Sequence, residues 1–173
     1  MKFYFKNDNI VDSDNEDESA NTDLISVERN KVMFYSDVTP ESCFKLISCI
    51  NKAKEYVAVQ NALSEFDEYT KIYLHICSDG GEVFPALAVI DIIQKSKISI
   101  ITVSEGCVAS AGVLIALAGK ERYMRSNGYM LLHELRSCSY GKYTVMKDEM
   151  KCNDILMKDM KKYILKRCKN KLL

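Results

Sequence analysis

The sequence predicts an α/β protein in which helices pack on a mostly parallel β-sheet. Two observations indicate this class. Strongly apolar segments, at 71–77 and at the β-branched 98–103, alternate with segments whose apolar residues recur at helical spacing. The resulting order of strand, helix, strand, helix and strand favours parallel pairing with helical crossovers. A chain of 173 residues, 47% of them hydrophobic, is expected to form one domain with a substantial core.

The first half of the chain is predicted to begin its ordered part with a strand at 31–35. Thr39 and Pro40 then form a helix start, because a hydroxyl cap followed by proline at the first helical position suits a helix N-terminus. Phe44, Ile47 and Ile50 recur at helical spacing, and the helix is expected to end near residue 56. The polar stretch 58–70 is predicted to be a loop.

The second half is predicted to contain the strand 71–77, a turn at 78–81, a helix at 82–95 and the strand 98–103. Gly106 is expected to interrupt the chain before a short helix at 110–118. Short strands at 122–124 and 129–132 flank a turn signal at 126–128. A long helix at about 143–169 follows, with an apolar stripe on one side. That stripe consists of Val145, Cys152, Leu156, Met160 and Ile164.

Charge is balanced overall but unevenly distributed. The formal net charge is +0 and the pI is about 6.7, so nothing favours a nucleic-acid partner. Residues 7–28 hold eight acidic residues and no lysine or arginine, which is typical of a solvated, disordered segment, with a regulatory or partner-binding arm as the alternative. We therefore expect residues 1–28 to form an acidic tail and residues 29–173 to form the folded domain.

The remaining composition excludes several classes of protein. No run of about 18 apolar residues predicts a membrane span, and the N-terminus does not read as a signal peptide. The seven cysteines show no Cys-x-x-Cys spacing and no Cys/His cluster, so neither a metal nor any other cofactor is expected. Free cysteines in apolar surroundings, namely Cys43, Cys49, Cys77 and Cys107, suit a reducing compartment such as the cytoplasm.

Three separated positions carry candidate chemistry. Ser110 lies between small residues where a loop enters a helix, Gly81 lies in a Gly-Gly turn between strand and helix, and His133 follows an apolar strand. A serine nucleophile needs a base and donors for the oxyanion, which His133 and the N–H groups of Gly81 and Ala111 could supply. Structural roles remain open: a helix cap or packing residue for the serine, a simple or phosphate-binding turn for the glycines, and a structural surface or core residue for His133.

The ordered blocks Tyr73–Val83, Ala88–Asp91, Gly106–Gly112 and Tyr129–His133 together resemble the proteolytic subunit of the Clp protease, ClpP. The resemblance implies a crotonase-like ββα superhelix with a protruding handle helix at about 143–169. It also implies Ser110 as nucleophile, His133 as base, and Gly81 and Ala111 as oxyanion donors. Residues 135–142, including Leu135 and Gly141, resemble the strand that aligns a substrate peptide.

The resemblance further implies an unfolded polypeptide substrate, assembly into a homo-oligomeric ring, and a partner AAA+ unfoldase. Asp79 stands where the family usually has proline, which suggests a divergent branch such as a viral or phage homologue, located in the host cytoplasm or the virion. The third triad residue of the family is an aspartate downstream of the handle helix. We expect this chain to lack that aspartate and the family's C-terminal end.

Without the triad aspartate, three explanations of the catalytic site are open. Glu134 or Glu105 could orient the histidine, a partner chain could supply the acid, or the chain could be a shortened, impaired homologue. The leading hypothesis is a serine endopeptidase of the ClpP type. The alternatives are a catalytically impaired subunit that assembles with or modulates another Clp ring, and a crotonase-type acyl-CoA enzyme, which leaves Ser110 and His133 without roles.

Overall fold

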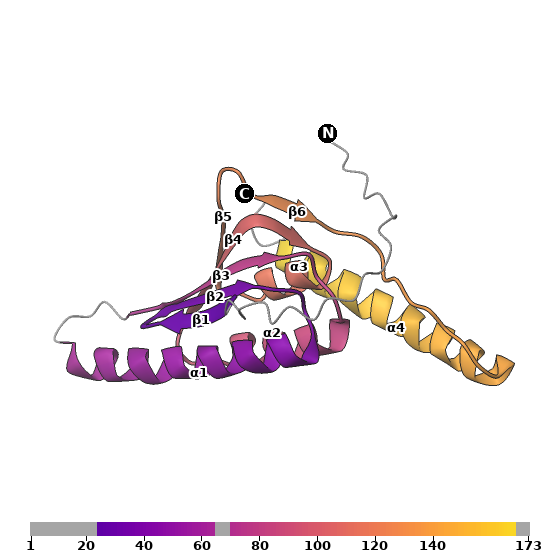
Figure 1. Cartoon of the computed structure of the whole chain (residues 1–173), viewed down its shortest axis with the longest axis horizontal. Coiled ribbons are helices and arrows are strands. Elements are labelled where there is room, and N and C mark those ends of the chain that lie inside the picture. Colours follow the sequence, from indigo (N-terminus) through magenta and orange to yellow (C-terminus); the bar gives the residue numbers. More distant parts are fainter. Residues whose placement is uncertain (1–23, 65–69, 169–173) are drawn as a thin grey trace, which may run out of the picture.

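The computed structural model describes residues 24–64 and 70–168. Within them the chain forms one six-stranded sheet in the order β1-β2-β3-β4-β5, with β6 also paired to β4 (Figure 1). Only β1 (Ile25–Glu28) pairs antiparallel, with β2 (Lys31–Tyr35), and every other pairing in the sheet is parallel. The predicted α/β class is therefore confirmed.

Helices α1 (Pro40–Leu63) and α2 (Val83–Gln94) lie together along one face of the sheet (Figure 1). Alternation along the strands directs one set of side chains toward these helices. On β2 and on β3 (Ile72–Ser78) that set includes Val32, Phe34, Leu74 and Ile76, all fully buried. Burial of each such side chain contributes about 1.5–3 kcal/mol, so this face forms the core.

Helix α1 begins as predicted and ends later than predicted. The Thr39 hydroxyl accepts a hydrogen bond from the Ser42 N–H at 3.1 Å, and the Ser42 hydroxyl accepts one from the Thr39 N–H at 2.9 Å, which forms a capping box. The helix continues to Leu63, so the predicted loop at 58–70 is wrong over its first six residues. Val57 is the last buried residue of α1, and because the turns beyond it face solvent, the apolar periodicity fades before the helix ends.

Strand β4 (Ile100–Ala109) is longer than predicted because it passes through Gly106, which adopts a positive φ of 57°. Its first half pairs with β5 (Glu121–Met124), and its second half pairs with β6 (Tyr129–Leu131). The turn signal between β5 and β6 therefore joins two strands that both pair with β4. Thus β4 extends to the residue before Ser110, where the short helix α3 (Ala111–Ala116) follows.

Helix α4 (Tyr143–Cys168) projects from the body, as expected for a handle helix (Figure 1). Its C-terminal half is anchored: the Tyr163 hydroxyl donates to the Leu114 carbonyl at 3.1 Å, and Arg167 donates to the Ala118 carbonyl at 2.9 Å. Met160 and Ile164 of the predicted stripe pack against the core. Val145 and Cys152 are exposed, so the stripe is wrong for the projecting half of the helix.

The N-terminal boundary differs from the prediction. Residues 25–28 form β1, and the Tyr35 N–H donates to the Leu24 carbonyl at 2.9 Å, so this end of the expected tail is part of the sheet. The remainder of that tail, 1–23, lies outside the described residues.

Across the parts that the structure describes, no helix is long and apolar enough to cross a membrane, and no metal-binding cluster of acidic, histidine and cysteine side chains occurs. All seven cysteines are free thiols. Cys43 and Cys49 are buried as small apolar residues, whereas Cys107 is exposed, contrary to expectation.

Candidate active site

The carboxyl ends of the parallel strands β2, β3, β4 and β6 open onto one cavity of about 720 Å³. In α/β sheets, ligands bind at this end because the loops that follow the strands converge there. Gly81 follows β3, Ser110 follows β4, and His133 follows β6, and all three line the cavity. The structure thus brings together three candidate residues that lie up to 52 positions apart in the sequence, the separation of 81 and 133.

Ser110 adopts a strained backbone conformation, with φ 51° and ψ −122°. Such a conformation costs a non-glycine residue about 1–3 kcal/mol and occurs preferentially at functional sites. Ser110 is the N-cap residue of α3, yet its hydroxyl makes no capping hydrogen bond. A structural role as a helix cap is therefore not realised, and the sharp strand-to-helix turn leaves the hydroxyl available at the cavity.

The glycine turn packs directly against Ser110. A Cβ atom on Gly80 would lie 2.5 Å from the Ser110 Cβ and 3.1 Å from the Ala111 nitrogen, so only glycine permits this approach. A Cβ on Gly81 would lie 2.3 Å from the Val38 carbonyl oxygen. The Gly80 N–H donates to the Ser78 hydroxyl at 3.1 Å, which stabilises the turn at the end of β3.

Gly81 forms an isolated parallel β-bridge with Val38, and this bridge does not use the Gly81 N–H, which can therefore donate to a substrate. Val38 donates to the Gly80 carbonyl at 2.7 Å and accepts from the Glu82 N–H at 2.8 Å, as in a parallel bridge. In that pattern the N–H of the middle residue points away from its bridge partner. The N–H of Ala111, at the start of α3, lies beside Gly80, although Ala111 itself is buried and does not line the cavity.

A backbone hydrogen bond brings the His133 segment to Ser110. The Ser110 N–H donates to the Leu131 carbonyl at 2.9 Å, and His133 follows two residues later. The His133 Nδ1 lies 2.6 Å from the Glu134 carbonyl oxygen. Because a carbonyl only accepts, Nδ1 carries the proton in this contact, and in the neutral imidazole the lone pair is on Nε2.

The Ser110 hydroxyl and the His133 imidazole share the cavity without a hydrogen bond between them, and within the described residues no carboxylate contacts His133. Catalytic hydrogen bonds are often long or absent before substrate binds. The arrangement therefore holds the residue types needed for acyl transfer to a serine, with His133 oriented by a backbone carbonyl.

The segment predicted to align the substrate, 135–142, is irregular in the structure, and its role in aligning a peptide stays a prediction. Leu135 lines the cavity, and its N–H donates to the Met157 sulfur at 3.1 Å, which ties the segment to α4 instead of to another strand. Gly141 adopts φ 140° and does not line the cavity.

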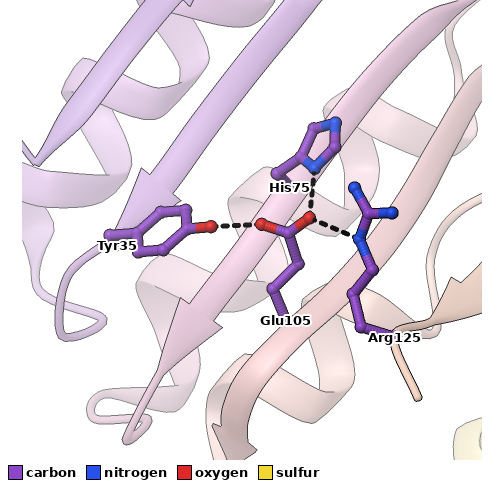
Figure 2. Close-up of polar contacts among 4 residues, drawn as sticks. All are labelled: Tyr35, His75, Glu105 and Arg125. Atoms are coloured by element: carbon purple, nitrogen blue, oxygen red, sulfur yellow. Dashed lines mark hydrogen bonds and ion pairs between the residues drawn. The ribbon is translucent and has the colours of Figure 1, made fainter. Parts of the chain in front are cut away.

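A second polar cluster, which the sequence did not predict, lies on the sheet face opposite α1 and α2. Figure 2 shows Glu105 at its centre, with Tyr35, His75 and Arg125 directed toward it. Glu105 accepts from the Tyr35 hydroxyl, lies 2.8 Å from the His75 Nδ1, and accepts from the Arg125 Nε at 2.9 Å. The cluster joins Tyr35 at the end of β2, His75 within β3, Glu105 within β4 and Arg125 directly after β5. His75 is buried there, which suits a structural role.

Electrostatics in this cluster favour an ionised Glu105. Burial alone raises the pKa of Glu105, but the hydrogen bonds from Tyr35, His75 and Arg125 outweigh it and lower the pKa to about 2. Burial and the Glu105 carboxylate raise the pKa of Tyr35 to about 12. The Glu105 carboxylate thus contacts His75 and not His133. Glu134 contacts His133 through its backbone carbonyl and not through its carboxylate. Neither glutamate acts as the orienting carboxylate suggested by the sequence.

Residues 28–172 match the profile of a protein family described as Clp protease. The chain belongs to the Clp protease family. Similarity to individual ATP-dependent Clp protease proteolytic subunits covers shorter stretches. Subunit 2 of Treponema pallidum is 40% identical over 65 residues, which is 36% of this chain and 33% of that protein. Subunit 1 of Leifsonia xyli subsp. xyli is 37% identical over 84 residues, which is 47% of this chain and 43% of that protein.

The Clp protease resemblance extends to the fold. A ClpP1 mutant from Listeria monocytogenes superposes with a TM-score of 0.61 at 20% identity, covering 80% of this chain and 72% of the other. This likeness confirms the ClpP-like fold that the sequence predicts. The matches to the two curated subunits span between a third and a half of those proteins' lengths.

Proposed function

We propose that this chain is a Clp-type serine endopeptidase in which Ser110 is the nucleophile and His133 the general base. The observation that carries the proposal is the conformation of Ser110: a strained serine without a capping bond, packed on Gly80, in one cavity with Gly81 and His133. A purely structural serine at a helix start would be expected to cap the helix in a relaxed conformation. Membership of a protease family supports the same conclusion.

In the proposed mechanism the Ser110 Oγ attacks the scissile carbonyl carbon and His133 Nε2 accepts the hydroxyl proton. The N–H groups of Gly81 and Ala111 donate to the oxyanion of the tetrahedral intermediate. Collapse of that intermediate releases the amine, which takes its proton from His133, and water then hydrolyses the acyl-enzyme by the same path. The Glu134 carbonyl holds the His133 tautomer that this cycle needs and stabilises the imidazolium less than a carboxylate would.

A fluorophosphonate probe tests the nucleophile directly. We expect covalent labelling of the 173-residue chain at Ser110, loss of labelling in Ser110→Ala, and a decrease of about 10³-fold or more in peptide cleavage in His133→Ala. Labelling at another residue, or equal peptidase activity in Ser110→Ala and the unchanged chain, would contradict the proposal.

A second candidate function, a catalytically impaired subunit of a Clp ring, is favoured by one observation. Within the described residues, His133 contacts neither the Ser110 hydroxyl nor a carboxylate. An impaired subunit should fold and join a ring but resist fluorophosphonate at concentrations that saturate an active Clp protease. Co-purification with a tagged active subunit, measured with and without labelling, distinguishes the two functions.

We further propose that the chain assembles into a homo-oligomeric ring and degrades unfolded polypeptides with an AAA+ unfoldase in a reducing compartment. Relatives are named as subunits of an ATP-dependent protease, which supports a partner that consumes ATP. Exposed apolar side chains on β6 and on the projecting half of α4 support assembly, because apolar surface left uncovered is typical of an interface. They are Tyr129 (71% exposed), Leu131 (57%), Met150 (66%) and Ile155 (62%).

A further inference from the structure

The cavity that holds Ser110 has a strongly acidic lining. Among the described residues, four carboxylate side chains line it, and Arg136 is the one lysine or arginine that does so. The four acids are Asp37, Asp79, Glu82 and Glu134. All four are exposed, and within the described residues none forms an ion pair. The cavity therefore presents an excess of negative charge that nothing in this part of the chain neutralises.

Asp79 and Glu82 flank the Gly80–Gly81 turn, and Gly80 packs directly against Ser110. Glu82 is the N-cap residue of α2, but its side chain makes no capping hydrogen bond, so the carboxylate is not used by the helix. Burial and the charge of Asp79 raise the pKa of the thiol of Cys107, which lies on β4 three residues before Ser110.

We propose that Asp79 and Glu82 are specificity-determining residues and that this cavity prefers peptides with an arginine or lysine side chain next to the scissile bond. The inference rests on the proposed peptidase function. A cationic side chain within a few ångströms of two carboxylates is attracted to them, and the walls of a cavity strengthen that attraction relative to open solvent. The same carboxylates repel the developing oxyanion, so a neutral peptide loses rate without the compensating attraction.

The test uses two fluorogenic peptides that differ only at the position before the scissile bond, with arginine in one and its neutral isostere citrulline in the other. For the 173-residue chain we expect kcat/KM for the arginine peptide to exceed that for the citrulline peptide about 3- to 30-fold. In the double variant Asp79→Asn, Glu82→Gln this ratio should fall to about 1, because turnover of the arginine peptide falls while that of the citrulline peptide rises. A general folding defect would instead lower kcat/KM for both peptides.

Glu55→Gln provides the matched control, since Glu55 is an exposed acid on α1 outside the cavity lining. In Glu55→Gln the ratio of kcat/KM for the arginine peptide to that for the citrulline peptide should equal the ratio in the unchanged chain. Raising the salt concentration from about 0.05 to about 0.5 M should reduce the ratio in the unchanged chain, because salt screens the attraction. A ratio near 1 in the unchanged chain, or a ratio that the double variant preserves, overturns the inference.

Binding to Ser110→Ala separates this inference from the proposed function. Fluorescence anisotropy of the labelled arginine and citrulline peptides reports the charge preference without any cleavage. If the chain neither cleaves peptides nor reacts with fluorophosphonate but binds the arginine peptide more tightly, the peptidase proposal fails and the charge preference stands. If the chain cleaves both peptides at equal rates and binds them equally, the charge preference fails and the peptidase proposal stands.

Discussion

Replacing Glu105 by glutamine should destabilise the protein in a pH-dependent manner. The pKa of Glu105 is lowered from its ordinary value of 4.5 to about 2, which corresponds to at most about 3.4 kcal/mol of stabilisation of the folded state. The Arg125 side chain is 64% exposed, and solvent screening reduces the expected effect of the charge to about 1–2 kcal/mol. At neutral pH we therefore expect Glu105→Gln to lower the free energy of unfolding by this amount.

The sign of the pH dependence follows from the lowered pKa. A carboxyl whose folded-state pKa is depressed stabilises the fold above its ordinary pKa, and this stabilisation is lost as the pH falls through the folded value. The difference between the unchanged chain and Glu105→Gln should therefore close between about pH 5 and pH 2. Urea unfolding over a pH series measures it, with Glu55→Gln as an exposed control. A difference that stays constant from neutral pH down to about pH 2 would refute this account of the cluster.

Three further predictions concern the turn and the handle helix. Gly80→Ala should abolish fluorophosphonate labelling, because its Cβ would lie 2.5 Å from the Ser110 Cβ, whereas Gly141→Ala, also at positive φ but with open space around it, should keep labelling. Tyr163→Phe removes the hydrogen bond to the Leu114 carbonyl and should lower the free energy of unfolding by about 1 kcal/mol in urea titrations, and no change would count against this anchor. Ile155→Glu should reduce assembly in light scattering while the helical content from circular dichroism stays constant, and intact assembly would exclude this face as an interface.

Local sequence signals predicted most of the helices and strands. The bounds that they did not predict depend on contacts made only in the folded chain. Thr39 and Pro40 predicted the start of α1 because a capping box involves only neighbouring residues. The end of α1 at Leu63 was missed because its last turns face solvent and carry no periodic signal. The extension of β4 past Gly106 depends on pairing with β6, about 20 residues further on, which outweighs the local tendency of glycine to interrupt a strand.

The residues of the site could be predicted from the sequence, but their arrangement in space could not. Spacing and residue type predicted Gly81, Ser110 and His133 as site residues, and the structure places all three around one cavity. The strain at Ser110 and its contact with Gly80 arise where β3 and β4 end side by side, so they depend on strand register. The Glu105 cluster was missed for the same reason, since its members pair only once β2, β3, β4 and β5 are aligned.

The register between β4 and β6 also determines the position of His133 relative to Ser110. The bond from the Ser110 N–H to the Leu131 carbonyl fixes the end of β6 against the end of β4, so a change in the pairing of these strands would move His133 relative to Ser110. The Glu134 carbonyl then selects the His133 tautomer from within the same segment. The segments that carry nucleophile and base are therefore coupled through a backbone hydrogen bond that does not depend on side-chain identity. Substitutions that preserve the backbone of β6 should leave the pair in register, whereas proline at 130 or 131, which disturbs the β6 backbone, should separate them.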